Sequence, residues 1–498
     1  MACTRFSAGA LALVIAGSLL ASLPDARAEE APDIAEEGRG GSGVVSLTLE
    51  AVEARARQSD DLQAEQQARR DHARWQSYRA DRAWWPKIEA QTLVAPVPAN
   101  ADPSRLDENL DEILALNLGP LVRQTARVIV PVYTFGRIGL AQELAEVGVD
   151  VAEIQALEAV ETQLLRARQA YFGRQLAEAF GALLAEGETL VNTSLREMED
   201  ARAFGDADFS TEDLRRLQIF KAELDTMVLD NARLRDLSEA ALRYITDIEQ
   251  PLSVPPLDPE QVDVPLASLQ ACQSFAGENR PDLQKLDGAI RARELQSSLA
   301  RRDFFPQVFA AADFGFAWST ESPALQRVCR RAAPGESCVN VDTLWTQPYA
   351  NPLNSLTFGV ALGLRWQFDF AQQRGKVGEA DAKLAELRAQ ARRARGAVAL
   401  DVEQAWRTAA DARERMHIEQ RRLDAARRWR NQYGLSQQLS ESVDMRDALD
   451  PLRAYYEAQV AVLESAHSYL DARARLARSI GAPSLDLLSE LNAQPGAN

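Results

Sequence analysis

The stretch from Leu356 to Phe370 alternates without a break between apolar residues and small or polar ones. A period of two predicts a β-strand with one apolar face. At about 3.3 Å per residue, this strand is long enough to cross the hydrocarbon core of a bilayer. Its aromatic residues gather at one end (Trp366, Phe368 and Phe370), as expected at a membrane interface. A strand of a soluble β-sandwich would alternate in the same way, so both interpretations stay open at this point.

A long helical segment follows this strand directly. From about Gly375 the apolar period becomes helical, and no proline appears before Pro451. We therefore predict a membrane strand that runs straight into a very long helix.

The first residues have the pattern of an export signal. Arg5 precedes an apolar run from Ala8 to Leu23, and Ala26-Arg27-Ala28 has the form of a cleavage site. Residues 1–28 are thus predicted to be a signal peptide. Beyond them we find no apolar run long enough for a transmembrane helix, so insertion into a membrane is expected to use a β-barrel.

The remaining chain contains a two-fold internal repeat. Trp84-Trp85-Pro86 is echoed by Phe304-Phe305-Pro306, and each motif precedes an alternating run. The second alternating run of each half ends near Tyr133 or Phe368, and Gln-Ala-Tyr171 and Gln-Ala-Trp406 follow these two residues at equal spacing. Each half is therefore predicted as helix, strand, loop, strand and helical hairpin.

The predicted boundaries follow from this repeat. They are a flexible tail (29–46), a first repeat (47–250), a Pro-rich linker (251–267), a second repeat (268–481) and a C-terminal tail (482–498). The first repeat has strands at about 87–97 and 121–135 and a hairpin at 138–250. The second has strands at about 307–318 and 355–370 and a hairpin at 375–481. We place the hairpin turns at 204–211, where Ser210 or Thr211 could cap a new helix, and from Tyr433-Gly434 to Val443.

Composition narrows the function. A formal net charge of −17 argues against nucleic-acid binding. Three scattered histidines and no phosphate-binding loop give no support for an enzyme, and we predict no cofactor and no metal site. Cys329 and Cys338 lie close together in a loop, where a disulfide is favoured over two free thiols in an oxidising compartment.

Four strands cannot close a barrel, and unpaired strand edges are not tolerated in lipid. Since about eight strands is the practical minimum, several protomers must share one barrel. The helical hairpins would then stand side by side and extend the barrel as a tube.

The chain resembles the TolC-type outer membrane efflux protein family from about Leu47 to Gly481. The resemblance rests on the repeat, the aromatic-Pro strand starts, Tyr133-Thr-Phe-Gly-Arg137 at the strand-to-helix turn, the two Gln-Ala-aromatic motifs, and the terminal Ala-Arg-Leu-Ala-Arg-Ser-Ile-Gly481. It implies a mixed α and β fold: a homotrimer in which four strands per protomer form a shared transmembrane β-barrel, continuing into a long periplasmic α-helical barrel. The implied partners are outer membrane lipid, a periplasmic adaptor (membrane fusion protein) and an inner-membrane pump.

The sharpest local match is Asp447-Ala-Leu-Asp450, similar to the pair of aspartates that form acidic rings at the family's periplasmic entrance. Residues three apart share a helix face, and symmetry would turn each carboxylate into a ring that attracts cations. Both could instead be ordinary acidic residues at a helix N-terminus. The family's arginine before this pair is absent, since Val443 stands there; Arg446 and Tyr433 are candidate substitutes in the entrance latch, and Asp213 is retained.

The sequence thus predicts an outer membrane exit duct of a tripartite efflux or type I secretion system, which conducts substrates passively. The alternative is a periplasmic coiled-coil scaffold or adaptor protein. That alternative explains the long helices and the acidity, but not four alternating strands placed at the helix breaks.

Overall fold

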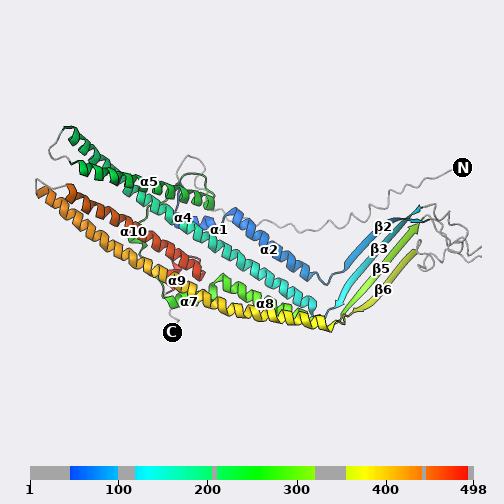
Figure 1. Ribbon diagram of the computed structural model, residues 1–498. Helices are drawn as coiled ribbons and strands as arrows, with labels where there is room; N and C mark the ends of the chain where they lie inside the picture. Colours follow the sequence, from blue (N-terminus) through cyan, green and yellow to red (C-terminus); the bar gives the residue numbers. More distant parts are fainter. Residues whose placement is uncertain (1–44, 99–117, 205–209, 320–354, 440–444, 492–498) are drawn as a thin grey trace, which may run out of the picture.

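The computed structural model describes residues 45–98, 118–204, 210–319, 355–439 and 445–491. The predicted signal peptide, most of the predicted N-terminal tail, and Cys329 and Cys338 lie outside the described residues. The molecule is elongated, with one sheet at one end and long helices that run away from it (Figure 1).

Four antiparallel strands form the sheet, in the order β2-β3-β5-β6. They are β2 (Lys87–Pro98), β3 (Leu118–Tyr133), β5 (Gln307–Ser319) and β6 (Ser355–Arg365). The register is continuous except at Pro131 and Tyr133, where β3 has an irregularity. Within the described chain, β2 and β6 are therefore edges that pair on one side only.

One face of this sheet is apolar and open. Phe358, Val360 and Leu362 of β6 are 77 %, 71 % and 75 % exposed, and Ile88 and Val94 of β2 are exposed to a similar degree. Leaving apolar surface exposed to water is unfavourable by roughly 25 cal/mol for each Å². A row of such side chains along two edge strands is the face that a lipid bilayer would cover.

The junction between β6 and its helix differs from the prediction. The alternation extends to Phe370, but β6 ends at Arg365 and α9 (Phe370–Leu439) begins five residues earlier than predicted. The cause is Asp369, whose carboxylate accepts a hydrogen bond from the backbone N–H of Gln372 at 3.2 Å and whose carbonyl accepts one from Gln373. An N-cap at this position starts the helix although the apolar period of two continues.

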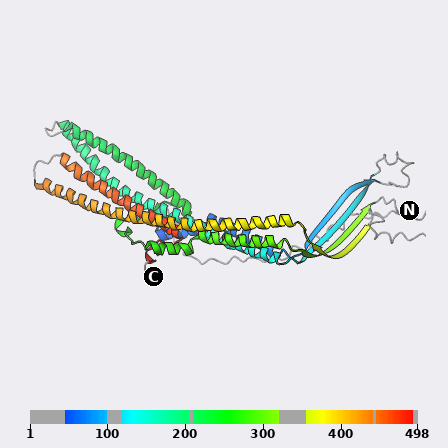
Figure 2. The same ribbon diagram turned by 60° about the horizontal axis from the view of Figure 1, so that its bottom comes forward.

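The helices form two hairpins that run side by side in both views (Figures 1 and 2). The first consists of α4 (Arg137–Phe204) and α5 (Thr211–Thr246), and the second of α9 and α10 (Met445–Ile480). α4 has 68 residues and α9 has 70, which corresponds to about 100 Å each at 1.5 Å per residue. α10 lies against α4 as well as α9 and so joins the two hairpins.

The shorter helices flank the parts of α4 and α9 that are nearer the sheet. They are α1 (Leu49–Arg57), α2 (Asp60–Asp81), α7 (Leu269–Asn279) and α8 (Pro281–Arg302). α2 packs against α4, and α8 packs against both α4 and α9. No helix among the described residues is both long and apolar enough to cross a bilayer.

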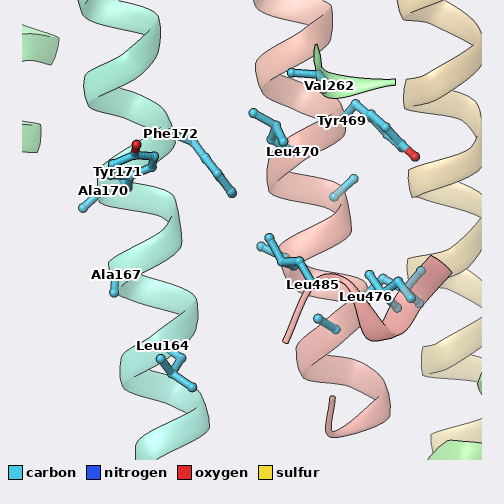
Figure 3. Packing of buried hydrophobic residues seen from close by; sticks show 14 of the residues in the cluster. Leu164, Ala167, Ala170, Tyr171, Phe172, Val262, Tyr469, Leu470, Leu476 and Leu485 are labelled. Carbon is cyan, nitrogen blue, oxygen red and sulfur yellow. The ribbon is translucent and has the colours of Figure 1, made fainter. Parts of the chain in front are cut away.

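The main core lies midway along the molecule, where both predicted tails and the predicted linker meet the helices. Figure 3 shows Phe172 of α4 pointing toward Leu470 of α10, and the same buried cluster includes Tyr171 and Leu476. The linker contributes β4 (Leu252–Ser253) and α6 (Pro259–Val262), and its Leu252, Val254, Leu257 and Val262 are buried in this core.

The predicted tails begin and end differently from the prediction. Val45 and Ser46, which we assigned to the flexible tail, form strand β1 and pair in parallel with β4. At the other end, the C-terminal tail is packed as far as α11 (Leu487–Glu490), with Leu488 fully buried. These segments are too short to have an apolar period, so the sequence pattern could not distinguish them from tails.

Buried arginines join these irregular segments to the helices. Arg168 of α4 pairs with Glu53 of α1 at 2.7 Å and donates to the carbonyl of Pro483 at 3.1 Å. Arg473 of α10 is buried, and this burial lowers the pKa of its guanidinium. Because a buried arginine needs carbonyl or carboxylate partners, it ties otherwise irregular chain segments to one position.

Candidate functional site

The acidic pair lies in the first turns of α10, at the end of the molecule opposite the sheet (Figure 1). Asp447 and Asp450 are both helical, but the side chain of Asp447 lies outside the described residues. Asp450 is exposed. Pro451 follows within the same helix and has no amide hydrogen, so it cannot donate to the carbonyl of Asp447. That carbonyl therefore adds a partial negative charge beside the two carboxylates.

A groove of about 650 Å³ lies next to Asp450, between α4, α5 and α10. Its apolar lining from α4 and α5 consists of five leucines (Leu183, Leu184, Leu190, Leu217 and Leu224) with Val191, Ile219, Phe220 and Met227. Its α10 side is charged: Arg453 donates from Nε to Glu457 at 2.8 Å, and this hydrogen bond raises the pKa of the Arg453 guanidinium. Asp450 is thus at the rim of an apolar groove beside an arginine–glutamate pair.

One hydrogen bond crosses between the hairpins at this groove. The hydroxyl of Tyr456 on α10 donates to Glu186 Oε1 on α4 at 3.2 Å. Burial, and next the neighbouring Glu186, raise the pKa of Tyr456 to about 12. The phenol therefore stays protonated at neutral pH and remains a donor to the carboxylate.

Of the three latch candidates, only Asp213 has a side chain among the described residues. Asp213 lies in the first turn of α5 and is buried, and its backbone N–H donates to Ser210 Oγ at 3.3 Å. This is the N-cap that the sequence predicted at the start of α5. Tyr433 and Arg446 lie in α9 and α10, and their side chains are outside the described residues.

The second hairpin turn is placed differently from the prediction. Tyr433 and Gly434 were assigned to the turn, but α9 continues through both of them to Leu439. A single glycine inside a helix costs only about 1 kcal/mol, which neighbouring helical residues can offset. Sequence reasoning also missed the pairing of Tyr456 with Glu186, because the two residues are distant in sequence and no local pattern links them.

The described residues contain no group of His, Cys, Asp and Glu side chains that could hold a metal ion. Cys272 is a buried free thiol, and its burial raises the pKa to about 11. The features described near Asp450 are a groove and charged side chains.

Comparison with known proteins agrees with this description. Residues 274–482 match the family model of the outer membrane efflux proteins. These residues run from α7 through both strands and both long helices of the second repeat. The second half of the chain is therefore similar to the outer membrane efflux protein family. The name of this family agrees with the predicted outer membrane localisation and with the predicted role in efflux.

Solved structures show the same fold over most of the chain. CusC matches with a TM-score of 0.66 and 14 % identity, over 87 % of this chain and 92 % of that chain. The Campylobacter jejuni CmeC outer membrane channel matches with a TM-score of 0.65 and 16 % identity, over 87 % and 86 %. The open state of the Neisseria gonorrhoeae MtrE outer membrane channel matches with a TM-score of 0.64 and 16 % identity, over 87 % and 89 %.

A comparison with curated protein sequences gave no significant match. The predicted fold of long helices with four antiparallel strands per chain is confirmed by the structural matches. TolC-like channels, whose fold this chain shares, are trimeric. The scaffold interpretation is set aside, because the strands that it left unexplained form one continuous sheet.

Proposed function

We propose that three copies of this chain close a 12-stranded barrel and form a passive exit duct. The observation that carries this proposal is the open four-stranded sheet, with unpaired edges at β2 and β6 and an exposed apolar face. Each backbone group left unpaired in lipid costs several kcal/mol. Pairing β2 of one protomer with β6 of the next removes every such edge.

The long helices support the same assembly. α5 exposes an apolar stripe of Ile219, Leu229, Leu237 and Tyr244, between 62 % and 81 % open. α9 exposes Leu400, Ile418 and Trp429. Exposed apolar rows on opposite sides of a protomer are typical of surfaces that pack against a second copy. We infer that α5 of one protomer lies against α9 of its neighbour.

Oligomeric state tests this assembly. Protein extracted in a mild detergent is expected to run as a trimer before heating and as a monomer after boiling. The double variant Leu237→Glu/Tyr244→Glu is expected to weaken the trimer, because it places three pairs of charges in the seam, whereas Glu249→Gln on the exposed end of the same segment is the control. A wild-type protein that is monomeric, and soluble without detergent, would overturn the proposal.

At the far end, we infer that Asp447 and Asp450 form two acidic rings at the periplasmic entrance. Both residues lie within one helical turn of α10, so three-fold symmetry would place six carboxylates around the entrance. The carbonyl of Asp447, which Pro451 leaves without a helical donor, would add to the negative potential. Such a ring attracts cations and repels anions.

We further infer that the end of the hairpins that holds the groove, opposite the sheet, meets a periplasmic adaptor and an inner-membrane pump. The pump would supply the energy for transport. Tyr433, Arg446 and Asp213 are proposed to hold the entrance closed, since all three belong to the tips of the two hairpins. Residues 1–28 are proposed to serve as the export signal.

Single-channel recording tests the acidic rings. In planar bilayers under a salt gradient, wild-type protein is expected to give a small, cation-selective conductance. Asp447→Ala/Asp450→Ala is expected to increase the conductance and reduce the selectivity, while Glu464→Gln, farther along α10 and exposed, is the control. Selectivity that survives the double substitution would exclude the rings and leave the duct standing.

A further inference from the structure

The charged residues of the sheet all lie on one face. The described strands contain six of them: Lys87, Glu89, Arg123, Arg127, Asp313 and Arg365. Directly paired residues of neighbouring strands point to the same side, and the pairing register places all six together. The opposite face carries the exposed apolar rows. In a barrel with its apolar face toward lipid, all six point into the water-filled interior.

The two carboxylates of the sheet lie on either side of Arg127. Arg127 is paired across the strands with Glu89 on one side and Asp313 on the other. Arg127 Nε donates to Asp313 Oδ1 at 2.5 Å. The positive charge of Arg127 is therefore offset by neighbouring carboxylates on the same face.

Two other cations also have close partners. Lys87 shares a strand and a face with Glu89, two residues away. The guanidinium carbon of Arg365 lies 5.3 Å from the centre of the Phe309 ring, beside Gly363, whose missing side chain leaves room for that ring.

Arg123 differs from all of them. Its direct cross-strand neighbours are Leu93 and Ala317, and the residues two places away on its own strand are Leu121 and Thr125. None of these is acidic, and Arg123 is exposed. β3 runs from the end of the sheet that is farthest from the helices toward the helices. Arg123 therefore lies farther from the helices than Arg127 does.

We propose that Arg123 and its two symmetry copies form an anion-attracting ring inside the barrel. The inference rests on the proposed trimeric barrel and concerns solutes that carry carboxylate, phosphate or sulfonate groups. Three guanidinium groups without nearby carboxylates raise the local concentration of such anions. The duct would then carry two filters of opposite sign, acidic at the periplasmic entrance and basic near the exit.

A reporter cysteine between the two arginine rows measures this potential directly. Thr125→Cys lies on the same face as Arg123 and pairs with Gln91 and Gly315. In a background with Cys329 and Cys338 replaced by serine, intact cells are treated from outside with an anionic or a cationic methanethiosulfonate of similar size. The ratio of the two reaction rates reports the sign of the potential at position 125.

With Arg123 in place, the anionic reagent is expected to be favoured. Arg123→Gln is expected to lower the ratio of anionic to cationic rates roughly threefold at physiological salt, and Arg123→Lys to preserve it. Arg365→Gln is the matched control, because Arg365 lies far along the sheet, beyond the screening length of about 8 Å.

The two possible failures are distinguishable. If both reagents react and Arg123→Gln leaves their ratio unchanged, the ring is excluded while the duct stands. If neither reagent reacts at position 125, the charged face does not line a water-filled passage, and the proposed barrel fails with it.

Discussion

The two helical hairpins follow the same plan, but they are packed differently at the ends that lie farthest from the sheet. Near the tip of the first, five apolar side chains are buried together: Val191, Met198, Leu214, Leu217 and Leu224. Near the tip of the second, the buried cluster consists of Ala426, Tyr455 and Ala458, and the guanidinium of Arg430 lies 3.9 Å from the centre of the Tyr455 ring. The first tip depends on apolar burial, and the second on two alanines and a cation–π contact.

This difference indicates which hairpin can move. Burying each leucine contributes about 1.5–3 kcal/mol, whereas a partly buried cation–π contact contributes about 0.5–2 kcal/mol and a buried alanine less than a leucine. The second hairpin also carries the acidic pair and is fastened to the first by Tyr456 and Glu186. We therefore expect the first hairpin to act as the fixed wall and the second as the part that opens the entrance.

The largest effect is expected in the first hairpin. Leu217→Ala removes a side chain that is 5 % exposed from the apolar cluster, and should destabilise this end of the first hairpin by about 2–5 kcal/mol. Hydrogen exchange should rise in the first turns of α5, with little change in α10. Gln218→Ala, at an exposed position of the same helix, is the control, and equal exchange in both variants would remove the basis of the comparison.

A smaller effect is expected at the link between the hairpins. Tyr456→Phe keeps the ring but removes the hydrogen bond to Glu186, at a cost of about 0.5–1.5 kcal/mol. Exchange should increase in the distal half of α10 and the single-channel conductance should rise. Tyr455→Phe is the control, since the Tyr455 hydroxyl bonds only within its own helix, to Gln459. If both variants behave alike, Tyr456 does not restrain the second hairpin.

The same contrast continues along α9. Its half nearer the sheet is joined to α8 by three ion pairs at heptad spacing, Asp287–Arg395, Glu294–Arg388 and Arg301–Asp381. The charges are reversed in the third pair, so a slip of one heptad would oppose Glu294 to Asp381. Arg388→Gln should cost less than about 1 kcal/mol in thermal unfolding, because the pair is exposed. A loss of several kcal/mol would mean that α9 is held by this ladder rather than by apolar contacts.

The smallest expected effect is on the stability of the protein at acidic pH. Hydrogen bonds from Ser297, and then from Arg301, lower the pKa of the Asp381 carboxyl below its usual 3.8. Because this pKa is lower in the folded state, the stabilisation is present above about pH 4 and is lost as the pH falls below it. Asp381→Asn should therefore flatten the acid limb of the melting-temperature profile. Asp411→Asn, at an exposed position of the same helix, is the control. If Asp381→Asn keeps the wild-type acid limb as well, Asp381 does not contribute in this way.

Much of the fold could be predicted from the sequence where a residue pattern repeats along an element. The alternation in β6 and the long proline-free segments each extend over many residues, and so predicted the strands and the hairpins. The end of β6 could not be predicted, because Asp369 starts the helix through a single cap while the alternation continues to Phe370.

Segments held by single long-range contacts were beyond sequence reasoning. The two ends of the chain and the linker meet in the core through Arg168, the pairing of Val45 with Leu252, and the buried Leu488. At the candidate entrance, the acidic pair could be identified from its spacing, whereas the bond from Tyr456 to Glu186 depends on how two hairpins pack. Such pairings require the tertiary arrangement.

A cross-link across the proposed seam between protomers tests whether three copies of the sheet close into one barrel. Gln91→Cys on β2 and Ala361→Cys on β6 lie on the charged face at the two edges of the sheet. They are combined in one chain without Cys329 and Cys338, and treated with a water-soluble bis-maleimide of about 10 Å reach. This is shorter than the distance across four strands at about 4.8 Å spacing, so a link can form only between protomers.

A closed trimeric barrel should give covalent dimers and trimers and nothing larger, with neither product from the two single-cysteine variants. Monomer alone would show that the edges do not meet, and a ladder that continues past the trimer would show that the sheet does not close after three copies.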